Sequence, residues 1–155
     1  MSTNGRGLTA PAERSLRLEI PPDARFSRAA RERVTAFALA HEVGPHDAAE
    51  FVTAVSEAIA NAIEHSRTPH AIELACSFEG GRITARIADD GIGFALETLR
   101  EPRLPEPLAE RGRGLPIMRQ CSHFIAIDSA PGRGTVVTLG RTVAPRDADD
   151  RMLAS

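Results

Sequence analysis

The clearest periodicity in the chain is helical and runs from Asp47 to Ser66. Apolar residues recur there at three- and four-residue intervals, so they form one stripe of an α-helix that can pack on a sheet. On the other side Glu57 and Asn61 are four positions apart, which places both side chains on one line, with His65 close by. A carboxylate, an amide and an imidazole could converge there on one ligand, although the same pattern also fits a solvated polar face.

The stretch before this helix carries one strand pattern and one helix pattern. Polar and apolar residues alternate from Ser15 to Ile20, which predicts a short half-buried strand at the edge of a sheet, and Pro21-Pro22 ends it. Apolar residues at helical spacing predict a first helix from Ala24 to about His41. Two consecutive helices therefore precede the main sheet.

Strand patterns dominate the rest of the chain. Alternation from Ala71 to Phe78 and from Arg82 to Ala88, on either side of Gly80-Gly81, predicts a β-hairpin. Two more strands are predicted from His123 to Asp128 and from Thr135 to about Thr142. The predicted order is strand, two helices, hairpin, irregular segment, helix and two strands.

The irregular segment lies between the hairpin and the last helix. Residues 95–111 lose clear periodicity and contain three prolines, so we expect a mobile lid there. The run from Gly112 to Leu115 then leads into Pro116, which suits a glycine turn that feeds a helix start. Backbone N–H groups at such a start can hold phosphate oxygens.

Length and composition indicate one compact domain, because 155 residues with 42% hydrophobic composition suffice for one core and not for two. Residues 1–14 are rich in Gly, Ser, Thr and Pro without periodicity, and we expect a disordered arm. Residues 143–155 are polar and charged, and we expect a flexible tail. The domain should therefore span residues 15–142.

Charge and cysteine content exclude several classes of protein. A net charge of -2 and scattered arginines argue against binding to nucleic acid or to a membrane surface. No apolar run approaches the ~20 residues of a membrane span, and the first residues lack the apolar core of a signal peptide, so we expect a cytoplasmic protein. Cys76 and Cys121 lie far apart without ligand spacing, and we expect reduced, buried thiols.

A second polar motif follows the hairpin. Asp89 stands at the end of a predicted strand, and Gly91 and Gly93 after it allow a sharp turn and a close approach of a ligand to the backbone. By itself this motif also fits an ordinary strand-end turn. Neither a P-loop nor a dinucleotide-binding glycine motif is present, so a nucleotide would have to be held in another way.

Four short motifs, taken in order, resemble the N, G1, G2 and G3 boxes of the GHKL ATP-binding superfamily. They are Glu57-x-x-x-Asn61-x-x-x-His65, Asp89-x-Gly91-x-Gly93, Gly112-x-Gly114-Leu115 and Gly134-Thr135. The resemblance covers roughly residues 15–142 and is most similar to the small bacterial anti-sigma-factor serine kinases, whose central helix reads VSEAxxNAIxH. It implies a Bergerat fold of the α+β class, with a mixed, mostly antiparallel sheet, helices on one face, and ATP between the central helix and the lid.

The resemblance implies chemical roles for the central helix. Asn61 would coordinate Mg²⁺ through its side-chain oxygen while the metal bridges the ATP phosphates, and a neutral amide suits a metal already surrounded by phosphate charge. Glu57 would be the catalytic base that accepts a proton from a serine hydroxyl, or would orient a water molecule.

The resemblance also implies how the rest of ATP is held. Asp89 would accept a hydrogen bond from the adenine amino group, and the Gly134-Thr135 box would support that contact. Gly91 and Gly93 would let the backbone approach the base. On the phosphate side the implied residues are Gly112, Gly114, Leu115 and His65.

The match is looser in the lid. Arg111 and Arg113 could supply charge to the γ-phosphate, although solvated lid residues are an equal alternative. The family usually carries its lid arginine a little earlier, where this chain has Glu110. Pro116 after Leu115 also departs from the common pattern.

The function implied by the resemblance is that of an ATP-dependent protein serine kinase and anti-sigma factor. Such a protein would bind a sigma factor and phosphorylate a small STAS-type anti-anti-sigma partner on serine, and the family also admits a homodimer. The retained Glu57 favours catalysis. The alternative is a catalytically weak module that regulates a partner by ATP-dependent binding alone. A nucleotide-free structural domain would make all four motifs a coincidence.

Overall fold

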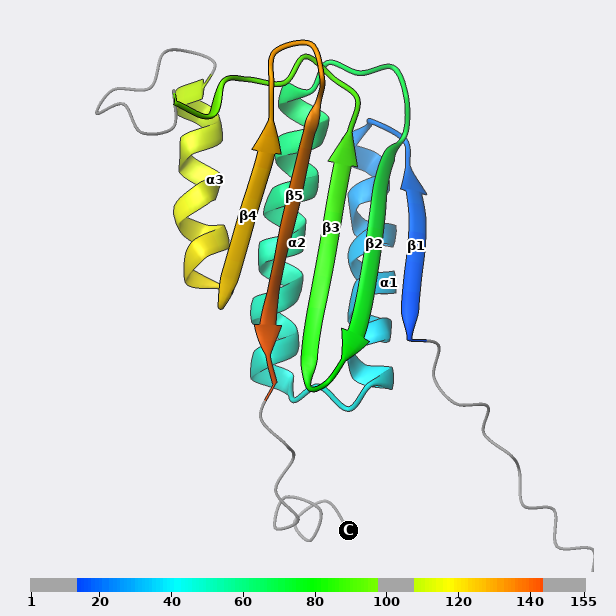
Figure 1. Cartoon of the computed structure of the whole chain (residues 1–155). Coiled ribbons are helices and arrows are strands. Elements are labelled where there is room, and N and C mark those ends of the chain that lie inside the picture. Colours follow the sequence, from blue (N-terminus) through cyan, green and yellow to red (C-terminus); the bar gives the residue numbers. More distant parts are fainter. Residues whose placement is uncertain (1–13, 98–107, 144–155) are drawn as a thin grey trace, which may run out of the picture.

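The computed structural model of the protein describes residues 14–97 and 108–143, and for residues 108–113 it describes the backbone alone. The predicted arm before residue 14, residues 98–107 of the predicted lid and the predicted tail from residue 144 fall outside these ranges. Five strands form one sheet, and helices cover one of its two faces (Figure 1). The fold class predicted from the sequence, α+β with helices on one face, is confirmed.

The sheet has the strand order β1-β2-β3-β5-β4, and each of its four pairings is antiparallel. Ser15–Ile20 lies at one edge, as its alternating pattern predicts. The hairpin joins the second and third strands through Gly80 and Gly81, which both have positive φ angles. The strands are β1 (Ser15–Ile20), β2 (Ile72–Glu79), β3 (Arg82–Asp89), β4 (Phe124–Ser129) and β5 (Thr135–Thr142).

The first two helices begin close to the predicted positions. A 3₁₀ turn, η1 (Ala24–Phe26), leads into α1 (Ser27–Ala40), and the side chain of Asp23 caps this turn. The central helix α2 (Pro45–His65) starts at a proline, which suits a first helical position because no N–H is needed there. No helix among the described residues is long and apolar enough to cross a membrane.

The main core lies between α2 and the sheet. The apolar stripe of α2 is buried, and Phe51, Val55 and Ile59 are at most 1% exposed. They belong to the same buried cluster as Ile83 on β3 and Leu139 on β5. Each such side chain contributes about 1.5–3 kcal/mol on full burial, so this stripe accounts for the central position of α2.

The last helix, α3 (Leu108–Gln120), differs from the prediction. A glycine turn was expected before a helix start at Pro116, but both G2 glycines and Pro116 lie inside the helix, so that expectation is wrong. Glycine and proline disfavour a helix interior, by about 1 and 3 kcal/mol relative to alanine. The helix forms nevertheless because Leu115 and Met118, which are 8% and 1% exposed, pack into the core.

A partly buried ion pair connects three elements at the end of the sheet opposite the predicted site. Arg141 on β5 is 7% exposed and donates to Oδ1 of Asp47, in the first turn of α2, over 2.9 and 3.1 Å. The same guanidinium donates to the carbonyl oxygen of Cys121, just after α3, over 2.9 Å. This interaction fixes the start of α2 and the end of α3 on the sheet.

Both cysteines are buried and neither forms a disulfide, as the sequence predicts. Burial raises the pKa of the Cys76 thiol to about 12. The pKa of Cys121 rises to about 11, first through desolvation and then through its hydrogen bond with Glu50. Both side chains therefore act as neutral, apolar parts of the core.

Candidate functional site

The polar line on α2 lies directly beneath α3. Glu57 and Asn61 are both half-buried there. A methyl group added at Gly114 would be 3.0 Å from Nδ2 of Asn61 and 3.3 Å from Oε2 of Glu57. The structure thus brings the N-box residues and a G2 glycine together, although they are far apart in the sequence.

Beside these residues is a small cavity of about 30 Å³ between α2, α3 and the sheet. Asp89 on β3 and Thr135 on β5 line it from directly opposite positions of neighbouring strands. Apolar side chains form most of the remaining wall. The lining residues are Ala58, Asn61, Ala62, Ile87, Asp89, Phe94, Leu115, Met118, Ile127, Thr135 and Val137. Four predicted site residues, one from each box, therefore share this cavity.

The cavity is closed by α3. Its volume is close to the ~30 Å³ that a single water molecule occupies in the liquid, so a purine does not fit. Leu115 and Met118 from α3 fill the remaining space. A base bound in this cavity would therefore need more space between α2 and α3 than the described residues leave.

The hydroxyl of Thr135 is oriented by a buried neighbour, Ser129, at the end of β4. The Ser129 hydroxyl donates to the carbonyl oxygen of Gly134 over 3.0 Å and accepts the N–H of Phe94 over 3.0 Å. Its single proton is thus used, so in the 2.8 Å contact between the two hydroxyls Thr135 is the donor. The hydroxyl oxygen of Thr135 can therefore still accept a hydrogen bond from a ligand. Nothing in the sequence pointed to Ser129, because a single serine at the end of a strand is not a recognisable motif.

The glycines of the G1 and G3 boxes are needed for contacts within the protein. A Cβ on Gly91 would lie 2.1 Å from the carbonyl oxygen of Ser66, and one on Gly93 would lie 2.1 Å from that of Ala130. A Cβ on Gly134 would lie 2.1 Å from the carbonyl oxygen of Asp89. Because they lack a side chain, these glycines let the loops around the cavity pack closely on each other. That a bound base also contacts the backbone at Gly91 and Gly93 stays a prediction.

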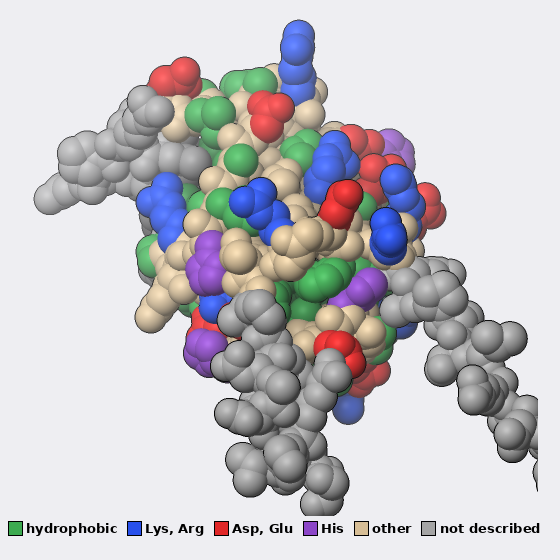
Figure 2. Space-filling model, turned by 60° about the horizontal axis from the view of Figure 1, so that its bottom comes forward, with side chains coloured by type: hydrophobic (Ala, Val, Ile, Leu, Met, Phe, Trp, Pro, Cys, Tyr) green, Lys and Arg blue, Asp and Glu red, His purple; other side chains and the backbone are tan. Residues whose placement is uncertain are grey.

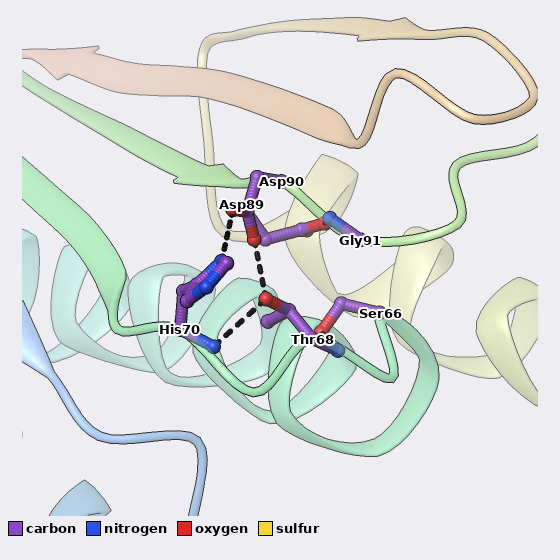
Figure 3. A network of polar contacts seen from close by, with 6 residues as sticks. All are labelled: Ser66, Thr68, His70, Asp89, Asp90 and Gly91. Carbon is purple, nitrogen blue, oxygen red and sulfur yellow. Dashed lines mark hydrogen bonds and ion pairs between the residues drawn. The ribbon is translucent and has the colours of Figure 1, made fainter.

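The loop after β3 is also held by side chains that follow α2 (Figure 3). Thr68 donates its hydroxyl proton to one oxygen of Asp90, and Nδ1 of His70 lies 2.5 Å from the other. Asp89 accepts the N–H of Gly91 over 2.9 Å. The hydrogen bonds from Thr68 and then His70 lower the pKa of Asp90. No sequence signal pointed to this network, since its partners are distant along the chain.

The remaining predicted residues lie elsewhere or outside the described part of the chain. His65 is the last residue of α2, is 6% exposed, and has its Nε2 3.6 Å from Oε2 of Glu64. It does not line the cavity. Gly112 lies within α3, and the side chains of Arg111 and Arg113 are not among those described. Their roles toward phosphate stay predictions.

The side-chain oxygens of Glu57 and Asn61 suit a metal ion that is already bound to a phosphate-containing ligand when it enters the site. Within residues 14–97 and 108–143, no three His, Cys, Asp or Glu side chains converge on a point that could hold a metal ion. One amide oxygen and one nearby carboxylate are too few for a resident ion of six ligands. They fit Mg²⁺ that already carries phosphate oxygens and water.

Known proteins resemble this chain in sequence over most of its length. The family described as "Histidine kinase-like ATPase domain" matches residues 20–141. The anti-sigma F factor of Thermoanaerobacter sp. (strain X514) is 31% identical over 121 residues, which cover 74% of this chain and 83% of that protein. The anti-sigma F factor of Bacillus subtilis (strain 168) is 31% identical over 124 residues, which cover 75% and 85%.

Solved structures show the same fold. The RsbU and RsbW domains from Mycobacterium tuberculosis superpose with a TM-score of 0.66 at 20% identity; the match covers 85% of this chain and 33% of that longer one. The SiaB-SiaC complex from Pseudomonas aeruginosa gives a TM-score of 0.63 at 15% identity and covers 82% and 89%. At these identities the likeness concerns the fold alone.

Proposed function

We propose, from the premise that the chain belongs to the family of histidine kinase-like ATPase domains, that it is an ATP- and Mg²⁺-dependent protein serine kinase. The observation that carries the proposal is the convergence of Glu57, Asn61 and Gly114 beside a cavity with Asp89 at its floor. The names of its relatives favour an anti-sigma factor. We further propose, from the resemblance, that it acts in the cytoplasm and binds a sigma factor and a STAS-type anti-anti-sigma protein.

The floor of the cavity suits adenine. Asp89 and Thr135 both present acceptor oxygens there, and an exocyclic amino group is the complementary donor. The apolar side chains around them, Ile87 and Val137 among others, suit the faces of a flat base. A guanine would place a carbonyl oxygen against the same acceptors, which would leave buried groups unpaired.

The reacting groups would lie further along α2. Asn61 lines the cavity, and Glu57 is one turn nearer the start of the helix, so phosphates extending from a base at Asp89 pass these two side chains in turn. Asn61 would offer its amide oxygen to Mg²⁺, and when bound the metal neutralises phosphate charge. Glu57 would accept the proton of the attacking serine hydroxyl as its oxygen bonds to phosphorus and the bond to ADP breaks.

In this proposal α3 rearranges when the nucleotide enters. The N–H groups of Gly112 and Gly114 lie inside the helix, where the carbonyl oxygens of the preceding turn accept them. Two glycines and Pro116 make this part of the helix intrinsically weak. We propose that this part of α3 unwinds and that the freed N–H groups bind the phosphates.

The test compares Glu57→Gln and Asp89→Asn with the wild type. We expect Glu57→Gln to bind ATP and Mg²⁺ normally in titration calorimetry but to lose transfer of labelled phosphate to a STAS-domain protein of the same genome. Asp89→Asn should lose binding itself, and Asp128→Asn on the open face of the sheet is the control. Undiminished transfer by Glu57→Gln would remove the proposed base. Binding without transfer in the wild type would favour the alternative, a regulatory module that works by nucleotide-dependent binding alone.

A further inference from the structure

Two acidic residues follow one another at the end of β3, beside the cavity that suits adenine. Asp89 is the last residue of the strand and lines that cavity. Asp90 comes next and does not line it. Either carboxylate can accept a hydrogen bond from an amino group, so residue chemistry alone does not distinguish between them. The contacts that each one makes within the protein do.

Both carboxylate oxygens of Asp90 are bound by side chains that follow α2 (Figure 3). The hydroxyl of Thr68 donates to one oxygen, and Nδ1 of His70 lies 2.5 Å from the other. An ionised carboxylate only accepts hydrogen bonds, so Nδ1 carries the proton in this contact. The backbone N–H of His70 donates in turn to Oγ1 of Thr68 over 3.0 Å. These two side chains form a clamp on Asp90, which makes Asp89 the better placed of the two to bind a ligand.

The clamp holds the chain just beyond the end of the sheet. The ladder between β3 and β5 ends at Asp89, opposite Thr135. Among the described residues, the next backbone hydrogen bond from this segment to another is made by Ile92, whose N–H donates to the carbonyl oxygen of Ser66 over 2.9 Å. Asp90 lies between these two points and shares a peptide bond with Asp89. Its side-chain contacts therefore restrict the orientation of the aspartate that lines the cavity.

We propose that Thr68 and His70 are positioning residues for adenine, on which they act by binding Asp90. The clamp holds the neighbouring Asp89 in the direction in which it accepts a hydrogen bond from the exocyclic amino group. This role rests on the proposed function, because it is there that Asp89 binds the base. Neither Thr68 nor His70 lines the cavity, so both act through the backbone that joins the two aspartates.

The two halves of the clamp differ in exposure. Basic and acidic side chains are interspersed on the face shown in Figure 2, and exposed pairs of this kind contribute little. The contact of His70 is also of this kind, because its side chain is 72% exposed. Thr68 is only 8% exposed, so its hydrogen bond to the carboxylate is better shielded from water. We therefore expect the larger effect from loss of the Thr68 hydroxyl.

Amide hydrogen exchange tests the positioning without any nucleotide. The N–H of Gly91 donates to Oδ1 of Asp89 over 2.9 Å, so its exchange reports whether that carboxylate stays in place. In Thr68→Val the exchange at Gly91 should accelerate on the order of 10-fold, because the lost hydroxyl binds a charged group. Exchange at Ile92 should change much less, since its bond to Ser66 does not involve this hydroxyl. Unchanged exchange at Gly91 would overturn the proposal, whatever the protein does with ATP.

Selectivity for the amino group tests the consequence for binding. The probes are ATP and purine riboside triphosphate, which is ATP without its exocyclic amino group, each titrated with Mg²⁺ by calorimetry. The wild type should bind ATP roughly 10-fold more tightly than the second nucleotide, and Thr68→Val should lose most of this preference. His70→Ala should reduce the preference about 2- to 3-fold. Because His70 is exposed, this variant keeps the test decisive even if Thr68→Val does not fold.

Two further variants separate the hydroxyl from other effects. Thr68→Ser keeps the hydroxyl and should keep the wild-type preference, whereas a packing role of the methyl group would make it the poorer variant. Thr35→Val is the matched control, because it removes a hydroxyl that donates to the carbonyl oxygen of Arg31 within α1. It should leave both nucleotide affinities unchanged. Thermal unfolding without nucleotide verifies that each variant is folded.

The outcomes distinguish this proposal from the one on which it rests. An equal loss of both affinities in Thr68→Val would show a purely structural role and would overturn the positioning role alone. A preference that persists in both Thr68→Val and His70→Ala would do the same. A wild type that binds the two nucleotides equally would overturn the contact between adenine and Asp89, and the positioning role with it.

Discussion

Replacing Gly134 by alanine should destabilise the fold much more than the same replacement at Gly132, two residues earlier in the same turn. Both glycines have positive φ angles, 73° at Gly134 and 76° at Gly132. A methyl group on Gly132 would meet nothing within 4 Å, whereas one on Gly134 would lie 2.1 Å from the carbonyl oxygen of Asp89. The two variants therefore share the backbone strain and differ in one collision.

The expected losses in the free energy of unfolding follow from the backbone strain, which both variants share, and from the collision at Gly134. A left-handed conformation costs a non-glycine residue about 1–2 kcal/mol, and the smaller entropy of the unfolded chain adds about 0.4–1 kcal/mol to this variant's stability. Gly132→Ala should thus lower the free energy of unfolding by about 1 kcal/mol. At Gly134 the collision with strand backbone adds about 1–3 kcal/mol, because a main-chain carbonyl cannot rotate away as a side chain can.

Urea unfolding of both variants beside the wild type measures this difference. At roughly 2–4 °C per kcal/mol for a chain of this size, thermal unfolding should separate the two variants by several degrees. Gly134→Ala must also displace Asp89, so its affinity for ATP should fall while that of Gly132→Ala stays near the wild-type value. Equal losses of stability in the two variants would refute the argument that Gly134 is required for close approach to β3.

Two further predictions concern charged groups. Arg141→Met should cost about 1.5–3 kcal/mol because it leaves the half-buried carboxylate of Asp47 and the carbonyl oxygen of Cys121 without their charged donor. Asp47→Asn in the same chain should recover part of the loss, and simple additivity in urea unfolding would contradict this coupling. The lowered pKa of Asp90 predicts a contribution to stability that is complete above the unfolded pKa of about 3.9 and is lost as the pH falls through the lower folded value. Thr68→Val should shrink this acid-dependent loss, and a stability profile identical to the wild type below pH 4 would show that the hydrogen bond does not matter.

Most elements of this fold were predictable because their signals are local. The helical stripe from Asp47 to Ser66 and the alternation on either side of Gly80-Gly81 each depend on neighbouring residues only, and the observed α2, β2 and β3 end within two residues of the predicted limits. The edge position of β1 was also predicted, from a short alternating run closed by prolines.

The helix α3 shows where local reasoning fails. Gly112, Gly114 and Pro116 predict a turn, and without the rest of the protein that prediction is physically sound. In the folded chain the burial of Leu115 and Met118 against α2 and the sheet outweighs the low propensity. No sequence pattern states whether a neighbouring surface is available to supply that burial.

The candidate site also has features that the sequence predicts and features that only the folded structure shows. The sequence by itself determined which residue types are present and that Glu57 and Asn61 share one line, because helical geometry requires it. Only the tertiary structure decided that Asp89 and Thr135 are opposite each other, that Ser129 orients Thr135, and that α3 closes the cavity. The reason is physical: periodicity is set by the backbone of one segment, whereas these contacts join residues distant along the chain, whose meeting depends on how all the segments pack together.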